Sequence, residues 1–189
     1  SALKSSHKKE TNKTAKAVLS TLLENAQIAK KENIPICQDT GLAIIFAEIG
    51  QEVHISGGSF VEAVNKGVRR AVKNGFLRAS VVKDPIDRIN TKDNTPAIIH
   101  SQIVPGNKIK LYILAKGGGA ENMSALKMLK PSDGIEGIKD FVLDTVKKAG
   151  PNPCPPIIVG VGIGGNFEKC AFLAKKALLR KIGVDAHRD

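Results

Sequence analysis

The sequence predicts a mixed α/β fold of the α+β kind, in which an antiparallel-rich sheet packs with helices. Several segments repeat apolar residues at helical spacing, which is typical of helices that bury one face. Two β-branched segments, Pro96–Val104 and Lys108–Lys116, predict strands. The turn-forming run Pro105-Gly106-Asn107 between them predicts an antiparallel hairpin, and a hairpin excludes a purely parallel sheet.

The first half of the chain predicts two helices around a buried strand. Apolar residues recur at helical spacing over Thr11–Lys31, and Pro35 ends that helix because the residue before a proline avoids helical geometry. Leu42–Ile49 is mostly apolar and β-branched, which indicates a buried strand, and Val53–Ile55 predicts a short partner strand. A valine stripe over Phe60–Val72 predicts the second helix.

The second half predicts one more short strand and a third helix before a proline-rich segment. Leu77–Val82 is rich in β-branched residues and predicts a strand. A helix is expected from Asp133 to about Lys148, with Asp133 and Glu136 as the capping pair at its start. Gly150 ends this helix, and the prolines that follow prevent its return.

The C-terminal part predicts a buried strand, a last helix and a metal ligand. Pro156–Gly162 predicts the strand, and Asn166 caps a helix that runs to about Ile182. Cys170 lies inside this amphipathic helix and is interpreted as a packing residue. Cys154 lies between prolines, which pre-set the backbone around a thiolate, and this setting indicates a metal ligand.

The length and composition predict one soluble domain over residues 1–189. The chain has 189 residues, of which 42% are apolar and 25% charged, and these are ordinary globular values. No apolar run approaches the roughly 20 residues needed to span a bilayer, and no apolar signal core follows the N-terminus. We therefore expect a cytoplasmic protein with no membrane partner.

The formal net charge of +11 allows three interpretations. A basic chain can bind nucleic acid, but the lysines here are spread along the helices and Trp is absent, so we expect no nucleic-acid partner. A lysine-rich surface on a thermostable protein is a second interpretation. Electrostatic attraction of a dianionic substrate is the third.

The cysteine pattern argues against a disulfide framework or a zinc ribbon. The chain has three cysteines, no CxxC pair and no signal segment. Cys37 opens the run Cys37–Gly41, which packs reactive polar side chains into one loop between a helix and a buried strand. The alternative is that Asp39 and Thr40 only organise a turn and that Cys37 is a small buried hydrophobe.

Two further stretches carry groups that can bind an anion. Lys116–Asn122 contains three glycines after a strand, and these can expose backbone amides to an anion or simply form a sharp loop. Arg78 begins a predicted strand, where it can clamp a carboxylate with two hydrogen bonds or form only a surface ion pair.

Taken together, these stretches resemble the class I fumarate hydratase and L-tartrate dehydratase family. The resemblance runs from about Glu10 to the last helix, and its motifs occur in the order that the family has. The matching motifs are Pro35–Gly41, Leu77–Ser80, Asp93–Pro96, Lys116–Asn122, Ala149–Pro156 and Gly162–Gly165.

The resemblance implies a 4Fe–4S cluster held by three cysteine thiolates. By motif match, Cys37 and Cys154 are two of these ligands and should approach each other in the fold. The third ligand of the family normally lies downstream of the last helix, so the chain is expected to be an α part truncated before that cysteine. We therefore expect no intact cluster on this fragment and no activity from it alone. The family also uses a β subunit or C-terminal domain, in an assembly of two α and two β subunits or in a dimer.

The implied reaction is the oxygen-sensitive, reversible hydration of fumarate to L-malate, a step of the tricarboxylic acid cycle. The open iron of the cluster is the Lewis acid. The resemblance places Gln38, Asp39 and Arg78 around the substrate, with Asp39 and Arg78 as catalytic residues and the amides of Gly118 and Gly119 near a carboxylate. Asp39 would bind the substrate hydroxyl or orient Arg78. The alternatives are an L-tartrate dehydratase α subunit and, more distantly, a basic module that binds nucleic acid or another anion.

Overall fold

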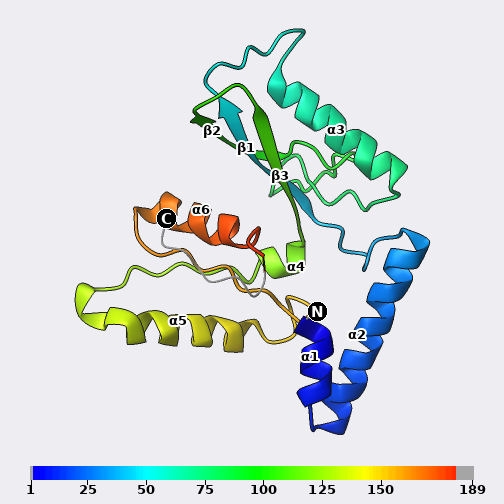
Figure 1. Ribbon diagram of the computed structural model, residues 1–189, viewed down its shortest axis with the longest axis vertical. Coiled ribbons are helices and arrows are strands. Elements are labelled where there is room, and N and C mark those ends of the chain that lie inside the picture. The colour runs from blue at the N-terminus through cyan, green and yellow to red at the C-terminus, as the bar shows by residue number, and fades with distance from the viewer. Residues whose placement is uncertain (1, 182–189) are drawn as a thin grey trace.

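The computed structural model describes residues 2–181 and contains helices around a small mixed sheet, as the sequence predicted (Figure 1). The sheet and α3 lie at one end of the molecule, the α1–α2 pair projects at the other, and α5 and α6 lie beside them. The elements are α1 (Ala2–Lys9), α2 (Lys13–Glu32), β1 (Leu42–Gly50), α3 (Phe60–Asn74), β2 (Ile98–Val104), β3 (Ile109–Lys116), α4 (Gly118–Glu121), the 3-10 turn η1 (Pro131–Asp133), α5 (Gly134–Ala149) and α6 (Phe167–Ala177).

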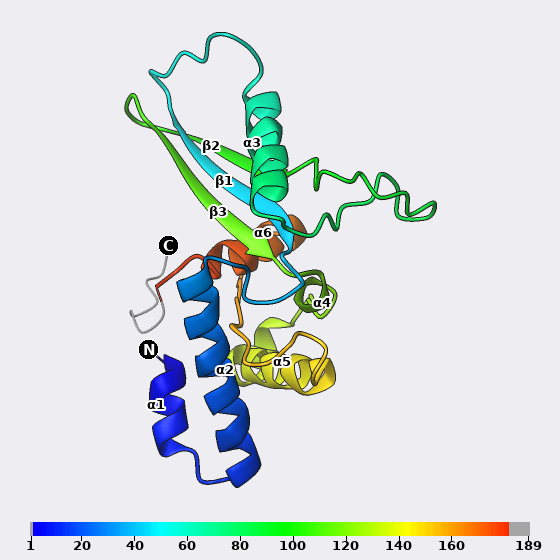
Figure 2. The same cartoon turned by 90° about the vertical axis from the view of Figure 1, so that its right-hand side faces the viewer.

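The most apolar strand lies at the centre of the sheet. The strand order is β2-β1-β3, with β1 parallel to β2 and antiparallel to β3. In register, Ile44 pairs with Ile98 on one side and with Leu114 on the other. The central run from Ile44 to Ala47 is buried. On one face of the strand, Phe46 meets Phe172 of α6 edge to face at 5.3 Å. Figure 2 shows α3 running along one side of this sheet.

The predicted hairpin is wrong, because β2 and β3 both pair with β1 and not with each other. The connection between them encloses the end of β1. The N–H of Gly50 donates to the carbonyl of Lys108 at 2.9 Å, and the N–H of Gln51 donates to that of Val104 at 2.8 Å. A Cβ on Gly50 would lie 2.2 Å from the carbonyl oxygen of Gly106, so only glycine fits there. A turn between two strands is therefore compatible with a third strand inserted between them.

Three other predicted strands are absent from the described residues. Val53–Ile55 and Pro156–Gly162 are irregular, and within Leu77–Val82 only Val82 forms an isolated bridge, to Asn90. The segment that contains Gly160 lies against α6, since a Cβ on that glycine would be 2.2 Å from the carbonyl oxygen of Ala174. The glycines of this segment thus pack against a helix, while its large apolar residues Ile158, Val159 and Val161 stay exposed.

The helix ends follow local capping chemistry in most places. The side chain of Asn166 accepts from the N–H of Lys169 at 2.9 Å, as predicted for α6. The predicted capping pair of α5 is wrong, because the side chain of Asp133 accepts from the N–H of Lys130 at 2.8 Å and makes no cap bond within α5. Glu136 pairs instead with Lys139 at 2.7 Å.

Residues Ala2–Lys9, for which the sequence predicted no element, form helix α1, and none of its residues is buried. The ring of His7 in this helix is hydrogen-bonded to the hydroxyl of Ser20 in α2 at 2.9 Å. The last helix ends at Ala177, and Ile182 lies outside the described residues. Within residues 2–181, no helix combines the length and the apolarity that crossing a bilayer demands.

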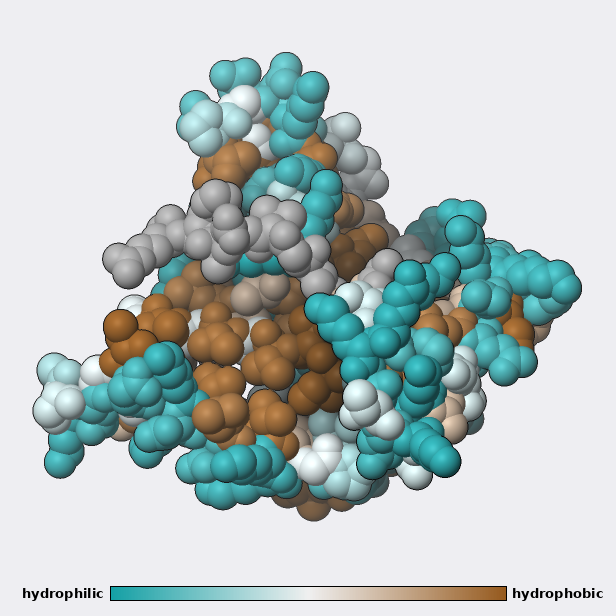
Figure 3. Space-filling model, turned by 60° about the horizontal axis from the view of Figure 1, so that its bottom comes forward, coloured by the Kyte–Doolittle hydropathy of each residue, from teal (hydrophilic) through white to brown (hydrophobic). Residues whose placement is uncertain are grey.

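The chain exposes far more surface than a compact protein does. Its accessible area is 14155 Å², whereas a compact monomer of this length exposes about 8,700 Å². A hollow of about 1110 Å³ lies between α5, α6 and the segments 123–131 and 156–165, and mostly apolar side chains line it. Figure 3 shows apolar side chains gathered in the middle of one face, with hydrophilic ones around them. Exposed apolar surfaces of this extent mark sites where a protein, a membrane or a ligand binds.

Candidate functional site

Thr40 ties the loop that carries Cys37 to the backbone of Arg78. The Thr40 hydroxyl accepts from the N–H of Arg78 at 2.9 Å and donates to the carbonyl of the same residue at 3.2 Å. Both backbone polar groups of Arg78 are thereby satisfied by one side chain, which replaces the strand pairing that the sequence predicted there. The backbone of Arg78 is thereby held against the Cys37–Gly41 loop, although Arg78 lies 38 residues away from Thr40 in the sequence.

Asn94 makes a second link between the segment that ends at Gly41 and the segment that follows Arg78. Its side chain is 4% exposed. The amide nitrogen donates to the carbonyl of Gly41 at 3.0 Å, and the amide oxygen accepts from the N–H of Ser80 at 2.9 Å. Asn94 has a φ of 61°, in the left-handed region that asparagine tolerates better than most residues. The motif Asp93–Pro96 thus stabilises the backbone of both segments through Asn94.

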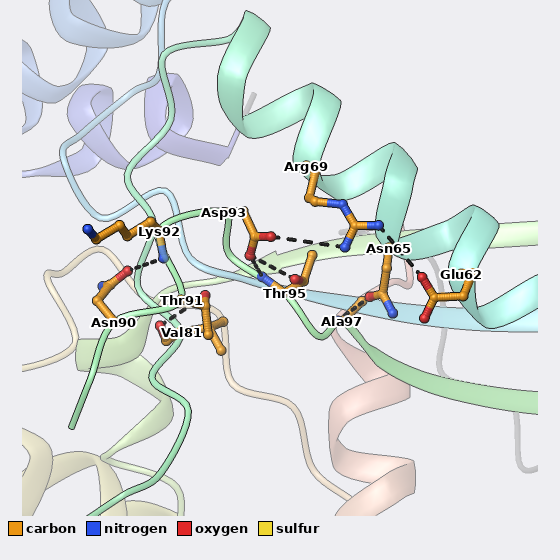
Figure 4. Close-up of polar contacts among 10 residues, drawn as sticks. All are labelled: Glu62, Asn65, Arg69, Val81, Asn90, Thr91, Lys92, Asp93, Thr95 and Ala97. Atoms are coloured by element: carbon orange, nitrogen blue, oxygen red, sulfur yellow. Dashed lines mark hydrogen bonds and ion pairs between the residues drawn. The ribbon is translucent and has the colours of Figure 1, made fainter. Parts of the chain in front are cut away.

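A polar network connects this motif to α3 (Figure 4). The carboxylate of Asp93 accepts from the hydroxyl of Thr95 at 2.7 Å and lies 4.0 Å from the guanidinium of Arg69. The hydrogen bonds from Thr95, with a smaller contribution from Arg69, lower the pKa of Asp93. Asn65 of α3, which is buried, accepts from the N–H of Ala97 at 2.9 Å. Helix α3 therefore fixes the loop that presents Asn94.

The glycine loop packs directly against Asp39. The N–H of Gly119 donates to Oδ2 of Asp39 at 3.3 Å, and a Cβ on Gly117 would lie 3.0 Å from the same oxygen. A Cβ on Gly41 would lie 2.7 Å from the backbone of Lys116, so the two loops meet backbone to backbone. Glycine is required at Gly41, because a side chain there would meet the backbone of Lys116, whereas a side chain at position 117 would press on the carboxylate of Asp39. The amide of Gly119 is engaged by Asp39, while the space beside Gly118 is open.

The loops that carry Cys37 and Cys154 converge on Gly119. On one side Gly119 contacts Asp39, two residues after Cys37. On the other side a Cβ on Gly119 would lie 3.0 Å from the carbonyl oxygen of Asn152, two residues before Cys154. In Figure 2 the loop between α2 and β1 runs beside α4, with α5 below.

Both cysteines of this pair are exposed free thiols. Cys154 has a φ of 57°, and a left-handed non-glycine residue is a feature that clusters at functional sites. Cys170 differs, because it is half-buried in α6 and its thiol donates to the carbonyl of Phe167 at 3.4 Å. The described part of the chain holds no group of three His, Cys, Asp or Glu side chains placed to bind one metal ion. The two exposed thiols thus lie on loops that both reach Gly119, whereas Cys170 lies in α6.

The side chains predicted to bind substrate are accessible. Arg78 and Gln38 are exposed, and within residues 2–181 the guanidinium of Arg78 makes no ion pair with a carboxylate. The surface ion pair that was the alternative for Arg78 is therefore not formed in the described structure. Asp39 is half-buried, and its contact is with Gly119, so it does not orient Arg78 directly here.

Sequence reasoning did not assign a role to Asn94 and assigned only a turn to Thr40. Both act through backbone groups that are distant in sequence, and such pairings leave no local pattern. Asn94 stood in a motif that carried the family resemblance, and its position before Thr95 and a proline was the available signal.

Comparisons with known proteins match the whole chain. A family model described as fumarate hydratase (Fumerase) matches residues 1–189. A protein of Methanocaldococcus jannaschii, named "Putative L(+)-tartrate dehydratase subunit alpha", is 47% identical over 194 residues, which cover 100% of this chain and 67% of that protein. Proteins of Escherichia coli and Shigella sonnei, both named L(+)-tartrate dehydratase subunit alpha, are 33% identical over 178 residues, which cover 92% of this chain. The chain spans 58% of the length of these last two relatives.

Proposed function

Because the chain belongs to the fumarate hydratase (Fumerase) family, we propose that it is the cluster-binding α part of a hydro-lyase that acts on a four-carbon dicarboxylate. The observation that carries this proposal is the pair of hydrogen bonds between the Thr40 hydroxyl and the backbone of Arg78, which holds an exposed arginine beside a loop with a free thiol. We regard residues 1–189 as a single α-type domain.

L-tartrate is the first candidate substrate and fumarate, with its hydration product L-malate, is the second. The names of the relatives favour tartrate, which the sequence had supported only as an alternative. The description of the family model favours fumarate. The two reactions use the same chemistry, since each breaks or forms a C–O bond next to a carbon that bears a carboxylate.

Cys37 and Cys154 would hold a 4Fe–4S cluster together with a third thiolate from outside the described residues. When bound, the cluster supplies a Lewis-acidic iron for the substrate hydroxyl. The exposure of both thiols and the convergence of their loops on Gly119 support this assignment. Exposed free thiols also favour a reducing, cytoplasmic compartment.

The remaining residues of the site bind and orient the substrate. Arg78 offers a planar, two-pronged donor to a substrate carboxylate. Gln38 is exposed next to Asp39 and can donate an amide hydrogen bond to the substrate. The open space beside Gly118 admits the second carboxylate to the backbone of the glycine loop.

Asp39 binds the substrate hydroxyl in this proposal. Its Oδ2 is occupied by the N–H of Gly119, whereas Oδ1 has no hydrogen-bond partner among residues 2–181. A carboxylate repels a dianion, but Lys116 lies close enough for a favourable electrostatic interaction with Asp39, which offsets this repulsion. Oδ1 is therefore the atom that would accept a hydrogen bond from the substrate hydroxyl.

The proposal includes a β subunit or a further domain. The relatives are named as alpha subunits, and the large exposed apolar hollow supports packing against more polypeptide. We propose that the chain alone is inactive, because the partner polypeptide is missing and because the described residues offer only two of the three thiolates that the cluster needs.

An anaerobic activity assay tests the proposed function. The full α polypeptide is produced with its β partner, reconstituted with iron and sulfide, and offered L-tartrate, L-malate and fumarate separately. We expect turnover of tartrate to oxaloacetate, and turnover of malate and fumarate if the second candidate is right. A reconstituted complex with full cluster absorption that leaves all three acids unchanged would refute the proposal.

A further inference from the structure

Two lysines and a glutamate form a partly enclosed cluster of charges behind the glycine loop. Nζ of Lys175 in α6 pairs with Oε2 of Glu121 in α4, and Nζ of Lys116 at the end of β3 lies 3.6 Å from the same oxygen. The side chains of Lys116 and Lys175 are 12% and 18% exposed. In the other ion pairs of the described residues, every partner is at least 36% exposed. The side chains of this cluster are therefore less exposed to water than those of the other ion pairs named here.

The enclosure makes the charge of Glu121 important for both lysines. Burial lowers the pKa of Lys116, Glu121 raises it, and Lys175 lowers it further. Without Glu121, two ammonium groups would face each other in a place that water reaches poorly. Surface pairs of this protein lack that penalty because solvent screens them.

The cluster joins the two parts of the chain that carry the cysteines. On the α4 side, Glu121 lies two residues after Gly119, which binds Asp39 in the loop of Cys37. On the α6 side, the carbonyl of Ala174, next to Lys175, packs against Gly160 in the segment that leads back to Cys154. A second close approach supports this packing, because a Cβ on Gly162 would lie 2.1 Å from the carbonyl oxygen of Cys170.

The contact between Gly119 and Asn152 is steric and supplies no specific attraction. We propose that the Glu121–Lys175 ion pair is a positioning device that holds the Cys154 segment against the Cys37 loop and so sets the spacing of the two thiolates. The inference rests on the proposed function for its purpose, but the spacing of the thiolates is measurable without a cluster. Glu121 and Lys175 are positioning residues, since neither contacts a thiol.

Dithiol cross-linking measures this spacing directly. The full protein with its partner is freed of iron anaerobically and treated with a short reagent that joins two thiols, and mass spectrometry then quantifies the peptide pair that contains Cys37 and Cys154. The variants are Glu121→Gln, which removes the charge at constant shape, and Lys175→Met, which keeps the apolar stem. Lys175→Arg keeps the charge, and Glu136→Gln removes the exposed pair with Lys139 on α5 as the matched control.

We expect Glu121→Gln and Lys175→Met to lower the cross-linking rate roughly tenfold, as the loss of one coupled ion pair predicts. Lys175→Arg and the control Glu136→Gln should keep the parent rate. Labelling of Cys37 and Cys154 by a monofunctional maleimide should stay unchanged, because these two thiols are exposed in either arrangement. A general loss of structure would raise that labelling at Cys170, which is half-buried, and would identify an unfolded variant.

The outcomes separate this inference from the proposed function. If Glu121→Gln does not fold, Lys175→Met carries the test, because it leaves Glu121 paired with Lys116. Parent-like cross-linking in a folded charge-removing variant would overturn the positioning role, even if the enzyme turns over tartrate or malate. Slower cross-linking in an enzyme that acts on neither acid would support the positioning role and refute the function.

Discussion

The hydroxyl of Thr40 binds both backbone polar groups of Arg78, with its two hydrogen bonds at 2.9 and 3.2 Å. One side chain thus determines where the arginine stands relative to the cysteine loop. A small change at Thr40 should therefore affect substrate binding without touching the substrate.

We expect Thr40→Val to lower kcat/KM of the reconstituted enzyme roughly tenfold to a hundredfold, because two hydrogen bonds of about 1 kcal/mol each are lost and Arg78 is released. Thr40→Ser keeps the hydroxyl and should stay near the parent value. Thr21→Val is the matched control, since the Thr21 hydroxyl donates only to the carbonyl of Ala17 within α2. Steady-state kinetics with cluster absorption measures the effect. Parent-like kinetics for Thr40→Val would show that Arg78 needs no such support.

Arg78→Lys should harm catalysis far more than stability. Lysine keeps the charge but loses the planar two-pronged donor, so a charge-assisted hydrogen bond worth about 1.5–3 kcal/mol is weakened or lost. We expect kcat/KM to fall roughly tenfold to a hundredfold while cluster absorption is kept. Arg70→Lys on the exposed side of α3 serves as the control and should be silent. Lost cluster absorption in Arg78→Lys would mean that the arginine supports the cluster pocket and not the substrate.

Asn94→Ala should be among the more destabilising single changes in the site. It leaves the carbonyl of Gly41 and the N–H of Ser80 without their partners in a buried place, at a cost of about 2–4 kcal/mol. Asn90→Ala is the comparison, because Asn90 also makes two hydrogen bonds but is exposed. It should cost less than about 1 kcal/mol. Urea unfolding measures the free energy of unfolding of both variants. Equal losses of stability would show that burial does not set the cost of losing these hydrogen bonds.

His100 should make stability fall as the pH drops below neutrality. Its ring stacks on Phe46 at 5.0 Å and meets Phe172 edge to face at 5.2 Å. Burial, and then the nearby charge of Lys175, lowers the pKa of His100 from its ordinary value of 6.5. The unfolded chain then binds a proton at a higher pH than the folded chain does. The stabilisation is therefore complete above about pH 6.5 and is lost as the pH falls toward the lowered pKa.

The His100→Phe variant should unfold with a weaker dependence on pH between about 7 and 5, because it has no proton to take up there. His54→Phe, at an exposed position, should keep the dependence of the parent. Thermal or urea unfolding across this range measures both. A parent-like slope in His100→Phe would assign the pH dependence to another group.

Much of the fold was readable from local sequence. The apolar run of β1, the stripe of α3 and the side-chain cap at Asn166 depend on residues within a few positions of each other. Local propensity and capping act at that range, so these elements appeared close to where they were expected. The cysteine loop, the glycine loop and Arg78 were likewise identified by their motifs, and the family that those motifs indicated is the one to which the chain belongs.

The sequence by itself determined the family, the strands of the sheet and the helices α2, α3, α5 and α6, while the tertiary structure decided which backbone groups pair. β1 lies between β2 and β3 because its apolar run gains partners on both edges, and a turn motif carries no information on a strand inserted later. Residues 77–82 form no strand because side chains take the place of a ladder: Thr40 binds Arg78, Asn94 binds Ser80, and Asn90 binds the carbonyl of Ala79. Hydrogen bonds between residues so far apart depend on chain geometry in three dimensions, which leaves no periodic trace in the sequence.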